Sequence, residues 1–302
     1  MAEDREMISI VIPLYNKEKS ISSTLQSVLA QTYADYEVVV VNDGSTDNSA
    51  AVVQCFISKS PISNTHCGIH LLNQQNAGVS AARNLGVKHS RGEYVVFLDG
   101  DDIWDKDFLS EIVRLMQDFP GKSIYGLGCA KIFGNKIPTD ESNDYYRGES
   151  RWDWSTMAYT GSSACVNKKD AIDEGLFDTR MTHGEDYDMW WRLQLKNGGA
   201  CYTKPYAYYR QDAENRAMHR IVPLEKFMPY YMDKFKEGRK RNLEFRRFYD
   251  QEMVYRLYPY LFDRRYRKKA RKLAMQLDYS CLKFSMRFRI MCPYIYRLIT
   301  GR

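Results

Sequence analysis

Apolar segments alternate with amphipathic segments through the first hundred residues, and this alternation constrains the fold more than any other feature. The apolar segments are short and rich in Val, Ile and aromatic residues, which is typical of buried strands. They occupy residues 7–14, 36–41, 69–72 and 94–98, and the segments between them, at 20–29, 46–56 and 81–89, carry apolar residues at helical spacing. The alternation predicts an α/β fold with a mostly parallel central sheet, flanked by helices and joined by right-handed crossovers.

The fourth predicted strand stops abruptly at an acidic turn, Asp99-Gly100-Asp101-Asp102. Ligands of open α/β sheets bind beyond the carboxyl ends of the strands. Carboxylates this close together repel one another unless a cation is present. Their hard oxygen atoms suit Mg²⁺ or Mn²⁺, and Mg²⁺ usually keeps substrate phosphates among its ligands. The turn therefore indicates a metal–diphosphate site. The alternative is a solvated turn in which Asp102 caps a helix that starts near Ile103.

Three further loops are expected at the same edge of the sheet, at residues 13–16, 42–45 and 76–78. A nucleotide would fit there, with Asp43 accepting a hydrogen bond from a base N–H group and Tyr15 stacking on the base. Arg83, one turn into the following helix, could reach a phosphate. Each feature also has a simpler explanation, because Asp43 could be an ordinary turn former and Arg83 a solvated or structural ion pair. Arg210, further along the chain, could close over a diphosphate or lie on the surface.

The order of the motifs is more specific than any one of them. The chain resembles the family 2 inverting glycosyltransferases of the GT-A fold over roughly residues 7 to 210. The matching stretches are Ile10-Val11-Ile12-Pro13-Leu14-Tyr15-Asn16, Val41-Asn42-Asp43-Gly44-Ser45-Thr46-Asp47, Asn76 through Gly86, Gly92 through Asp102, and Gly184-Glu185-Asp186. The resemblance implies a GT-A-type domain over residues 1–222 and leaves residues 223–302 as a separate C-terminal region.

The resemblance also implies a role for each matching residue. Asp43 would bind the base of a nucleoside-diphosphate sugar, usually a UDP-sugar. Asp99 and Asp101 would form the D-x-D pair that holds Mn²⁺ or Mg²⁺, with Asp101 the direct metal ligand and Asp99 nearer the ribose or sugar. Glu185-Asp186 would supply the catalytic base. The other residues that would hold the nucleotide are Pro13, Tyr15, Asn16, Asn76, Gly78, Arg83 and Gly100.

The chemistry of an inverting transfer agrees with this assignment. A direct displacement at the anomeric carbon needs one carboxylate to deprotonate the acceptor hydroxyl, and it needs positive charge on the departing diphosphate. Asp186 is favoured over Glu185 as the base, because a position at a helix N-terminus stabilises its ionised form. The alternative is that Glu185 and Asp186 supply only helix N-terminal charge.

The C-terminal region differs in charge from the rest of the chain. Residues 226–302 carry 21 basic and 7 acidic residues, whereas residues 1–225 carry 23 basic and 31 acidic residues. The pattern beyond residue 223 is mainly helical, basic and aromatic, which favours an anionic membrane surface as its partner. The alternative is that this region packs on the acidic body of the protein, and a homodimer is one arrangement that would allow it. Nucleic acid is the least favoured partner.

The sequence also suggests where such a protein would work. It has no run of 18 or more apolar residues, and its N-terminus, Met1-Ala2-Glu3-Asp4-Arg5, lacks the apolar region of a signal peptide. We therefore expect a cytoplasmic protein, held at the inner face of a membrane by its C-terminal region. By resemblance, the acceptor is a cell-surface glycan or a lipid-linked glycan.

Two other functions remain open at this point. A sugar-nucleotide-forming nucleotidyltransferase would share a metal and nucleotide site at the sheet edge, but it should carry a Gly-rich phosphate loop after the first strand, and residues 13–16 are not such a loop. A non-catalytic nucleotide- or nucleic-acid-binding protein would depend on the basic C-terminal region and would have no need of Glu185 and Asp186.

Overall fold

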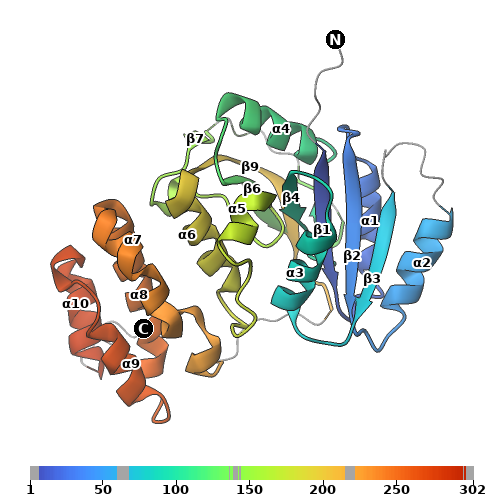
Figure 1. The fold of residues 1–302 in the computed structure, drawn as a ribbon. Coiled ribbons are helices and arrows are strands. Elements are labelled where there is room, and N and C mark those ends of the chain that lie inside the picture. Colours follow the sequence, from blue (N-terminus) through green and yellow to red (C-terminus); the bar gives the residue numbers. More distant parts are fainter. Residues whose placement is uncertain are drawn as a thin grey trace. The chain divides into compact units, whose positions relative to one another are not determined.

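The computed structural model of the chain describes residues 7–59, 68–135, 137–138, 142, 144–214, 222–294 and 296. The chain divides into two compact units, Met1–Met218 and His219–Arg302 (Figure 1). The first unit contains a nine-stranded sheet with the strand order β3-β2-β1-β4-β8-β6-β9-β5, in which β7 pairs with β9. The predicted domain boundary at residue 222 stays a prediction.

The first half of this sheet is parallel. Its strands are β1 (Ile8–Leu14), β2 (Tyr36–Asp43), β3 (Ile69–Gln74) and β4 (Tyr94–Phe97), and their crossovers contain α1 (Ile21–Leu29), α2 (Ser49–Lys59) and α3 (Val79–His89). The strands β2 and β4 are buried along their whole length. Their near-continuous apolar sequences follow from this burial, because helices cover both faces of a parallel sheet.

The second half of the sheet is mixed. It contains β5 (Ile103–Trp104), β6 (Ile124–Ile132), β7 (Arg147–Glu149), β8 (Ala164–Asn167) and β9 (Gly199–Arg210), with α4 (Phe108–Asp118), η1 (Trp154–Thr156), α5 (Lys168–Asp173) and α6 (Glu185–Asn197) between them. Here β8 runs antiparallel to both β4 and β6, whereas β6 and β9 are parallel. The predicted fold class, an α/β domain with a mostly parallel central sheet flanked by helices, is confirmed.

The expectation that Asp102 caps a helix starting near Ile103 is wrong. Residues Ile103–Trp104 form β5, which pairs with β9, and α4 begins only at Phe108 with Asp107 at its N-cap. Asp102 is instead buried, and its carboxylate accepts hydrogen bonds from Ser162 Oγ at 2.5 Å and from the Arg210 N–H at 3.2 Å. The pairing with β9, about 100 residues further on, decides the local structure here.

The second unit is mainly helical. It comprises η2 (Leu224–Lys226), η3 (Met228–Phe235), α7 (Lys236–Arg241), α8 (Leu243–Leu257), η4 (Tyr258–Leu261), α9 (Arg267–Ala274), η5 (Tyr279–Cys281) and α10 (Phe284–Met291). Aromatic rings of Phe235, Phe245 and Tyr249 pack together in its core, with centroids 5.1 to 5.7 Å apart. None of the helices among the described residues combines the length and the apolar character needed to cross a bilayer.

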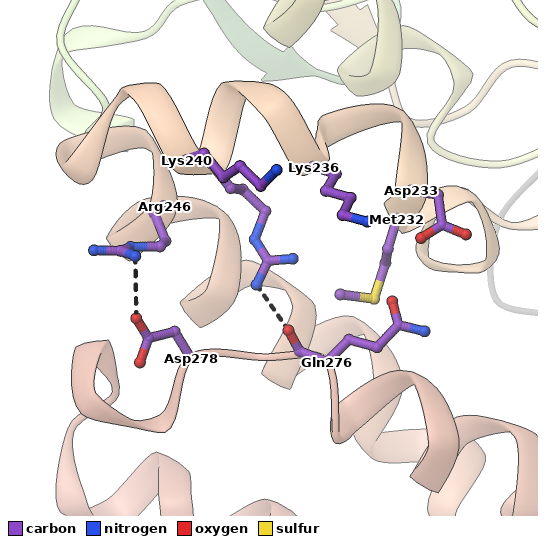
Figure 2. A pocket seen from close by; sticks show the side chains of 8 residues that line it. Met232, Asp233, Lys236, Lys240, Arg246, Gln276 and Asp278 are labelled. Carbon is purple, nitrogen blue, oxygen red and sulfur yellow. Dashed lines mark hydrogen bonds and ion pairs between the residues drawn. The ribbon is translucent and has the colours of Figure 1, made fainter.

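A hollow of about 410 Å³ lies within this second unit (Figure 2). Its lining is largely basic and consists of Met232, Asp233, Lys236, Arg239, Lys240, Arg246, Gln276 and Asp278. Three of the cations are already paired, and one of them, Lys240, lies 2.9 Å from Glu237. Arg239 lies 2.8 Å from the buried carboxylate of Asp250, and Arg246 lies 3.4 Å from Asp278. The basic composition of this unit is therefore partly balanced by internal ion pairs.

The helix α3 packs tightly on the parallel half of the sheet, where it contacts β1 and β2. Gly86 on α3 faces Val11 on β1, and a Cβ atom added at Gly86 would lie 2.3 Å from Val11 Cγ1. Only glycine permits this approach. Since α3 also carries the loop residues Asn76 and Gly78 at its start, the contact positions that loop at the edge of the sheet.

We expect Gly86→Ala to destabilise the protein by about 1–3 kcal/mol, because the new methyl group overpacks the contact with Val11. In a helix with free space around the glycine, Gly→Ala stabilises the protein by about 0.5–1 kcal/mol. The expected effect at Gly86 therefore has the opposite sign. Urea unfolding of Gly86→Ala, Val11→Ala and the double variant measures the effect. The double variant should lose less stability than the sum of the single variants, and strict additivity would contradict the proposed contact.

Candidate functional site

A pocket of about 410 Å³ lies beyond the carboxyl ends of β1, β2 and β4. Its walls combine apolar, acidic and basic side chains from segments that are distant in the sequence. The lining residues are Pro13, Leu14, Tyr15, Lys17, Asp43, Asn76, Gly78, Val79, Ala82, Arg83, Asp99, Gly100, Asp101, Thr182, Glu185 and Tyr209. The position is the one at which open α/β sheets bind ligands.

All the predicted site residues except Asn16 and Asp186 line this pocket. Asn16 connects two loops instead, because its Oδ1 accepts a hydrogen bond of 2.8 Å from the Thr46 N–H and its own N–H donates to Ser45 Oγ at 3.1 Å. Asp186 follows Glu185 at the start of α6 and is half-buried there. The structure thus brings the predicted residues together, while the role of each stays a prediction.

Asp43 orders the loop that precedes α3. Its Oδ1 accepts hydrogen bonds from the Ala77 N–H at 2.8 Å and from Gln74 Nε2 at 2.7 Å, and its Oδ2 accepts one from the Gly78 N–H at 2.9 Å. The neighbouring Gly44 has a φ of 69°, and a Cβ atom there would lie 2.8 Å from the Asn76 nitrogen. Asp43 is therefore more than a turn former, since it holds two loops of the pocket against each other.

Arg83 is buried and bridges two acidic groups. Its Nη2 lies 2.7 Å from Asp99 Oδ1 and its Nη1 lies 3.5 Å from Glu185 Oε1. Burial would lower the pKa of Arg83, but the charges of Asp99 and Glu185 outweigh burial and raise the pKa. The expectation of a solvated arginine is wrong, and the expectation of a structural ion pair is confirmed. The guanidinium group connects the acidic turn to the start of α6.

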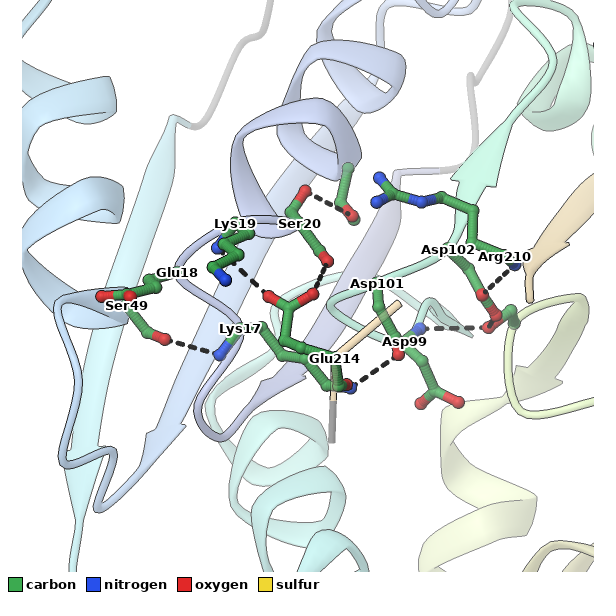
Figure 3. A network of polar contacts seen from close by, with 12 residues as sticks. Lys17, Glu18, Lys19, Ser20, Ser49, Asp99, Asp101, Asp102, Arg210 and Glu214 are labelled. Atoms are coloured by element: carbon green, nitrogen blue, oxygen red, sulfur yellow. Dashed lines mark hydrogen bonds and ion pairs between the residues drawn. The ribbon is translucent and has the colours of Figure 1, made fainter. Parts of the chain in front are cut away.

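The acidic turn after β4 concentrates negative charge in a buried place. Burial raises the pKa of Asp101, and the neighbouring Asp99 adds to this, whereas Lys17 lowers it. Burial also raises the pKa of Asp102 well above its usual value, with further contributions from Asp99 and Asp101. Lys17 offsets part of this negative charge, because its Nζ lies 2.6 Å from Asp101 Oδ2 (Figure 3).

Asp99 and Asp101 are the residues of this pocket that suit a divalent cation. Their oxygen atoms match the preference of Mg²⁺ and Mn²⁺ for hard ligands. Among the residues that the structure describes, no group of three or more His, Cys, Asp and Glu side chains could hold a metal ion. Two carboxylates are enough for a cation that takes its remaining ligands from a diphosphate and water.

The helix α6 begins with the two carboxylates predicted as the base. Gly184 precedes it with a φ of 74° and turns the chain so that Glu185 enters the pocket wall. Burial raises the pKa of Glu185 to about 7, helped by the charge of Asp186 and opposed by Arg83. Asp186 is the more accessible of the two, and its Oδ1 accepts a hydrogen bond of 2.8 Å from the Tyr187 N–H.

Three polar lining residues were not expected from the sequence, namely Lys17, Thr182 and Tyr209. Lys17 follows Tyr15 and Asn16 in the same loop, so its position gave a signal that it could face the site. Arg210 is buried and is not among the residues that line the pocket, since its Nη1 donates to Ser23 Oγ at 2.6 Å. Neither expectation for Arg210, closure over a diphosphate or surface exposure, describes this arrangement.

Glu185 should make the stability of the protein depend on pH. Its pKa of about 7 in the folded protein lies above the usual 4.5. Between these values the folded protein holds a proton that the unfolded chain has lost. The contribution of Glu185 to the free energy of unfolding is therefore fully present below the pKa of the unfolded chain, and it is lost as the pH rises through the pKa of the folded protein. The loss amounts to about 3 kcal/mol, at about 1.36 kcal/mol per pKa unit.

Urea unfolding of the wild type and of Glu185→Gln at about pH 5 and about pH 8 measures this effect. We expect the wild type to lose more stability than the variant between the two pH values, because the amide cannot ionise. Other carboxylates titrate in both proteins and cancel in the comparison. Equal losses in the two proteins would show that Glu185 has an ordinary pKa.

Two family models match the chain. The model of glycosyl transferase family 2 matches residues 9–176, and that of glycosyl transferase family group 2 matches residues 94–299. The chain is 37% identical over 114 residues to the glycosyltransferase GlyA of Streptococcus pneumoniae, which covers 38% of this chain and 16% of GlyA. It is 33% identical over 192 residues to an uncharacterized glycosyltransferase of Rickettsia felis, which covers 63% of this chain and 30% of that protein. The chain thus spans less than a third of the length of these two relatives.

Solved structures support the same fold. S. aureus TarS 1-349 in complex with UDP-GlcNAc superposes with a TM-score of 0.62 at 19% sequence identity, over 97% of this chain and 76% of TarS 1-349. The complex with UDP superposes with a TM-score of 0.60. At this identity the likeness shows the fold alone, and it agrees with the predicted GT-A type. The two family models each cover more than half of the chain, and the resemblance based on its motifs is confirmed: the chain belongs to glycosyl transferase family 2.

Proposed function

We propose that this protein transfers a sugar from a nucleoside-diphosphate sugar to an acceptor hydroxyl group, with inversion at the anomeric carbon. The observation that carries the proposal is the composition of the pocket. One cavity at the carboxyl edge of the sheet contains the ordered Asp43 loop, the buried Arg83, the acidic turn and the start of α6. Asp43 can bind a nucleotide, Arg83 and the acidic turn can bind a diphosphate with its metal ion, and the start of α6 can supply a catalytic base. No Gly-rich phosphate loop follows β1, which disfavours a nucleotidyltransferase.

A UDP-sugar is the proposed donor. TarS, which shares the fold, has been solved with UDP and with UDP-GlcNAc, and this supports a uridine nucleotide. Asp43 would accept a hydrogen bond from the base, because the loop contacts that it already makes hold its carboxylate in place. Tyr15 is 44% exposed and lines the pocket, so its ring is available for stacking.

The diphosphate would lie beside Arg83 and the acidic turn, which contact each other. Asp101, and Asp99 beside it, would hold Mn²⁺ or Mg²⁺, which when bound supplies positive charge to the departing diphosphate. Arg83 adds fixed positive charge from the α3 side, where its contacts with Asp99 and Glu185 orient the guanidinium group. Such preorganised charge stabilises a leaving group without further rearrangement.

Asp186 is the proposed catalytic base, and Glu185 is the proposed positioning residue beside it. A base that meets an incoming acceptor has to be accessible, and Asp186 is half-buried whereas Glu185 is only 9% exposed. Asp186 lies in the first turn of α6, where its Oδ1 accepts a hydrogen bond from the Tyr187 N–H. Glu185 is held against Arg83 and has a pKa of about 7, so a part of its population is protonated at neutral pH.

The second unit is proposed to bring the protein to its acceptor. Its residues carry a large excess of basic side chains, and several apolar side chains are exposed on it, among them Met275, Phe284 and Met291. Apolar groups among cations suit the interface of an anionic membrane. We propose a peripheral association with the cytoplasmic face of a membrane and a cell-surface or lipid-linked glycan as acceptor. Assembly of the basic unit into a homodimer remains the alternative.

A panel of UDP-, GDP- and TDP-sugars with Mn²⁺ or Mg²⁺ tests the donor. We expect one UDP-sugar to raise the melting temperature in a metal-dependent way and to be hydrolysed slowly. If no nucleotide-sugar changes the melting temperature or is hydrolysed, with or without metal, the proposed sugar transfer is refuted.

Asp186→Asn should keep the thermal shift with this donor and lose turnover by about 100-fold, the usual contribution of a general base. Glu185→Gln is the matched control, since it changes the neighbouring carboxylate in the same way. It should weaken donor binding through Arg83 and reduce turnover less. If Glu185→Gln is the variant that binds but does not turn over, the roles of the two carboxylates are exchanged.

A further inference from the structure

We propose that Lys17 is a built-in countercation of the acidic turn, which competes with a divalent cation for Asp101. The inference rests on the proposed function, because it takes Asp101 to be the metal ligand. It adds a regulatory role for a residue outside the motifs on which the family resemblance was based. Lys17 would set how tightly the empty donor pocket binds a metal ion.

The position of the Lys17 ammonium group is well defined. Its Nζ lies 2.6 Å from Asp101 Oδ2 and 2.5 Å from the backbone oxygen of Glu214 (Figure 3). The side chains of Lys17 and Asp101 are only 13% and 11% exposed. The backbone of Lys17 is held as well, since its N–H donates to Ser49 Oγ at 2.7 Å. The ion pair is therefore largely shielded from water, and Lys17 is held both at its backbone and at its ammonium group.

Charge balance explains why Asp101 needs this partner. Asp99 and Asp102 lie in the same turn, and both Asp101 and Asp102 are buried. Asp99 is paired with Arg83, and the carboxylate of Asp102 accepts two hydrogen bonds. Among the residues that the structure describes, Lys17 is the cation paired with Asp101. A buried carboxylate without a partner is strongly destabilising. Lys17 thus neutralises the carboxylate of Asp101, as a bound metal ion would.

A metal ion and the Lys17 ammonium group would repel each other at the same carboxylate oxygen. A divalent ion binds a carboxylate oxygen at roughly 2.0–2.1 Å, and an ammonium group 2.6 Å from that oxygen would lie against it with like charge. Metal binding at Asp101 Oδ2 would therefore weaken the contact of that oxygen with Lys17. The energy of the Lys17–Asp101 pair is subtracted from the energy of metal binding, and removal of the ammonium group should tighten the binding of the metal.

The experiment is a titration of the metal-free protein, residues 1–302, with Mn²⁺ alone, with free Mn²⁺ followed by electron paramagnetic resonance. We expect Lys17→Met to bind Mn²⁺ about tenfold more tightly than the wild type, which corresponds to about 1.4 kcal/mol. Lys17→Arg keeps the cation and should stay within about threefold of the wild type, which is less than 1 kcal/mol. Asp101→Asn should lose the site in either background.

Lys19→Met is the matched control. It removes the same charge from the same loop, and the Lys19 side chain is exposed and does not line the pocket. Its affinity for Mn²⁺ should equal that of the wild type. Circular dichroism and melting temperature confirm that each variant is folded, and Lys17→Arg supplies a test at the same position if Lys17→Met is not.

Three results would overturn the inference. If Lys17→Met binds Mn²⁺ no more tightly than the wild type, the competition does not exist, although the metal site of the proposed function stands. If Lys19→Met tightens binding as much as Lys17→Met, the effect is one of general charge and not of the ion pair. If no variant binds Mn²⁺, the metal site fails together with the inference, whereas binding of UDP-sugars without metal would still support a transferase.

Discussion

Compensation of buried negative charge at the end of β4 is the constraint on which the rest of the first unit depends. Three carboxylates follow one strand, and each is satisfied by a different part of the chain. Asp99 pairs with Arg83 of α3, Asp101 with Lys17 of the loop after β1, and Asp102 with Ser162 and the backbone of Arg210. The turn thereby connects segments more than 100 residues apart, and the pocket exists because these connections meet there.

Much of the fold could be predicted from the sequence. Strands β1 to β4 and the helices between them have strong local periodicity, and parallel strands necessarily end at one edge, which is why residues that follow them meet in one pocket. The strands β5 and β9 could not be predicted as partners, because their pairing spans about 100 residues and leaves no mark on local periodicity. The alternative in which Asp102 caps a helix overlooks this pairing.

The candidate site was predictable to a similar degree and for similar reasons. Residues that belong to motifs, such as Asp43 and Arg83, were found by their order along the chain. Their actual partners were not, since the contact of Asp43 with the loop before α3 and that of Arg83 with Glu185 join separate elements. Lys17 was missed because its significance depends entirely on Asp101, which lies 84 positions away.

The close approach of Gly86 to Val11 has a consequence for how this pocket can respond to a ligand. A helix seated on a strand with no spare volume cannot slide along it by fractions of a turn, so α3 is a fixed wall. On the opposite side, Glu214 beyond β9 is held by hydrogen bonds to Lys17, Lys19 and Ser20 of the segment that follows β1. Any adaptation of the pocket to the size of its ligand therefore has to come from the side chains of the other walls, and not from a shift of α3.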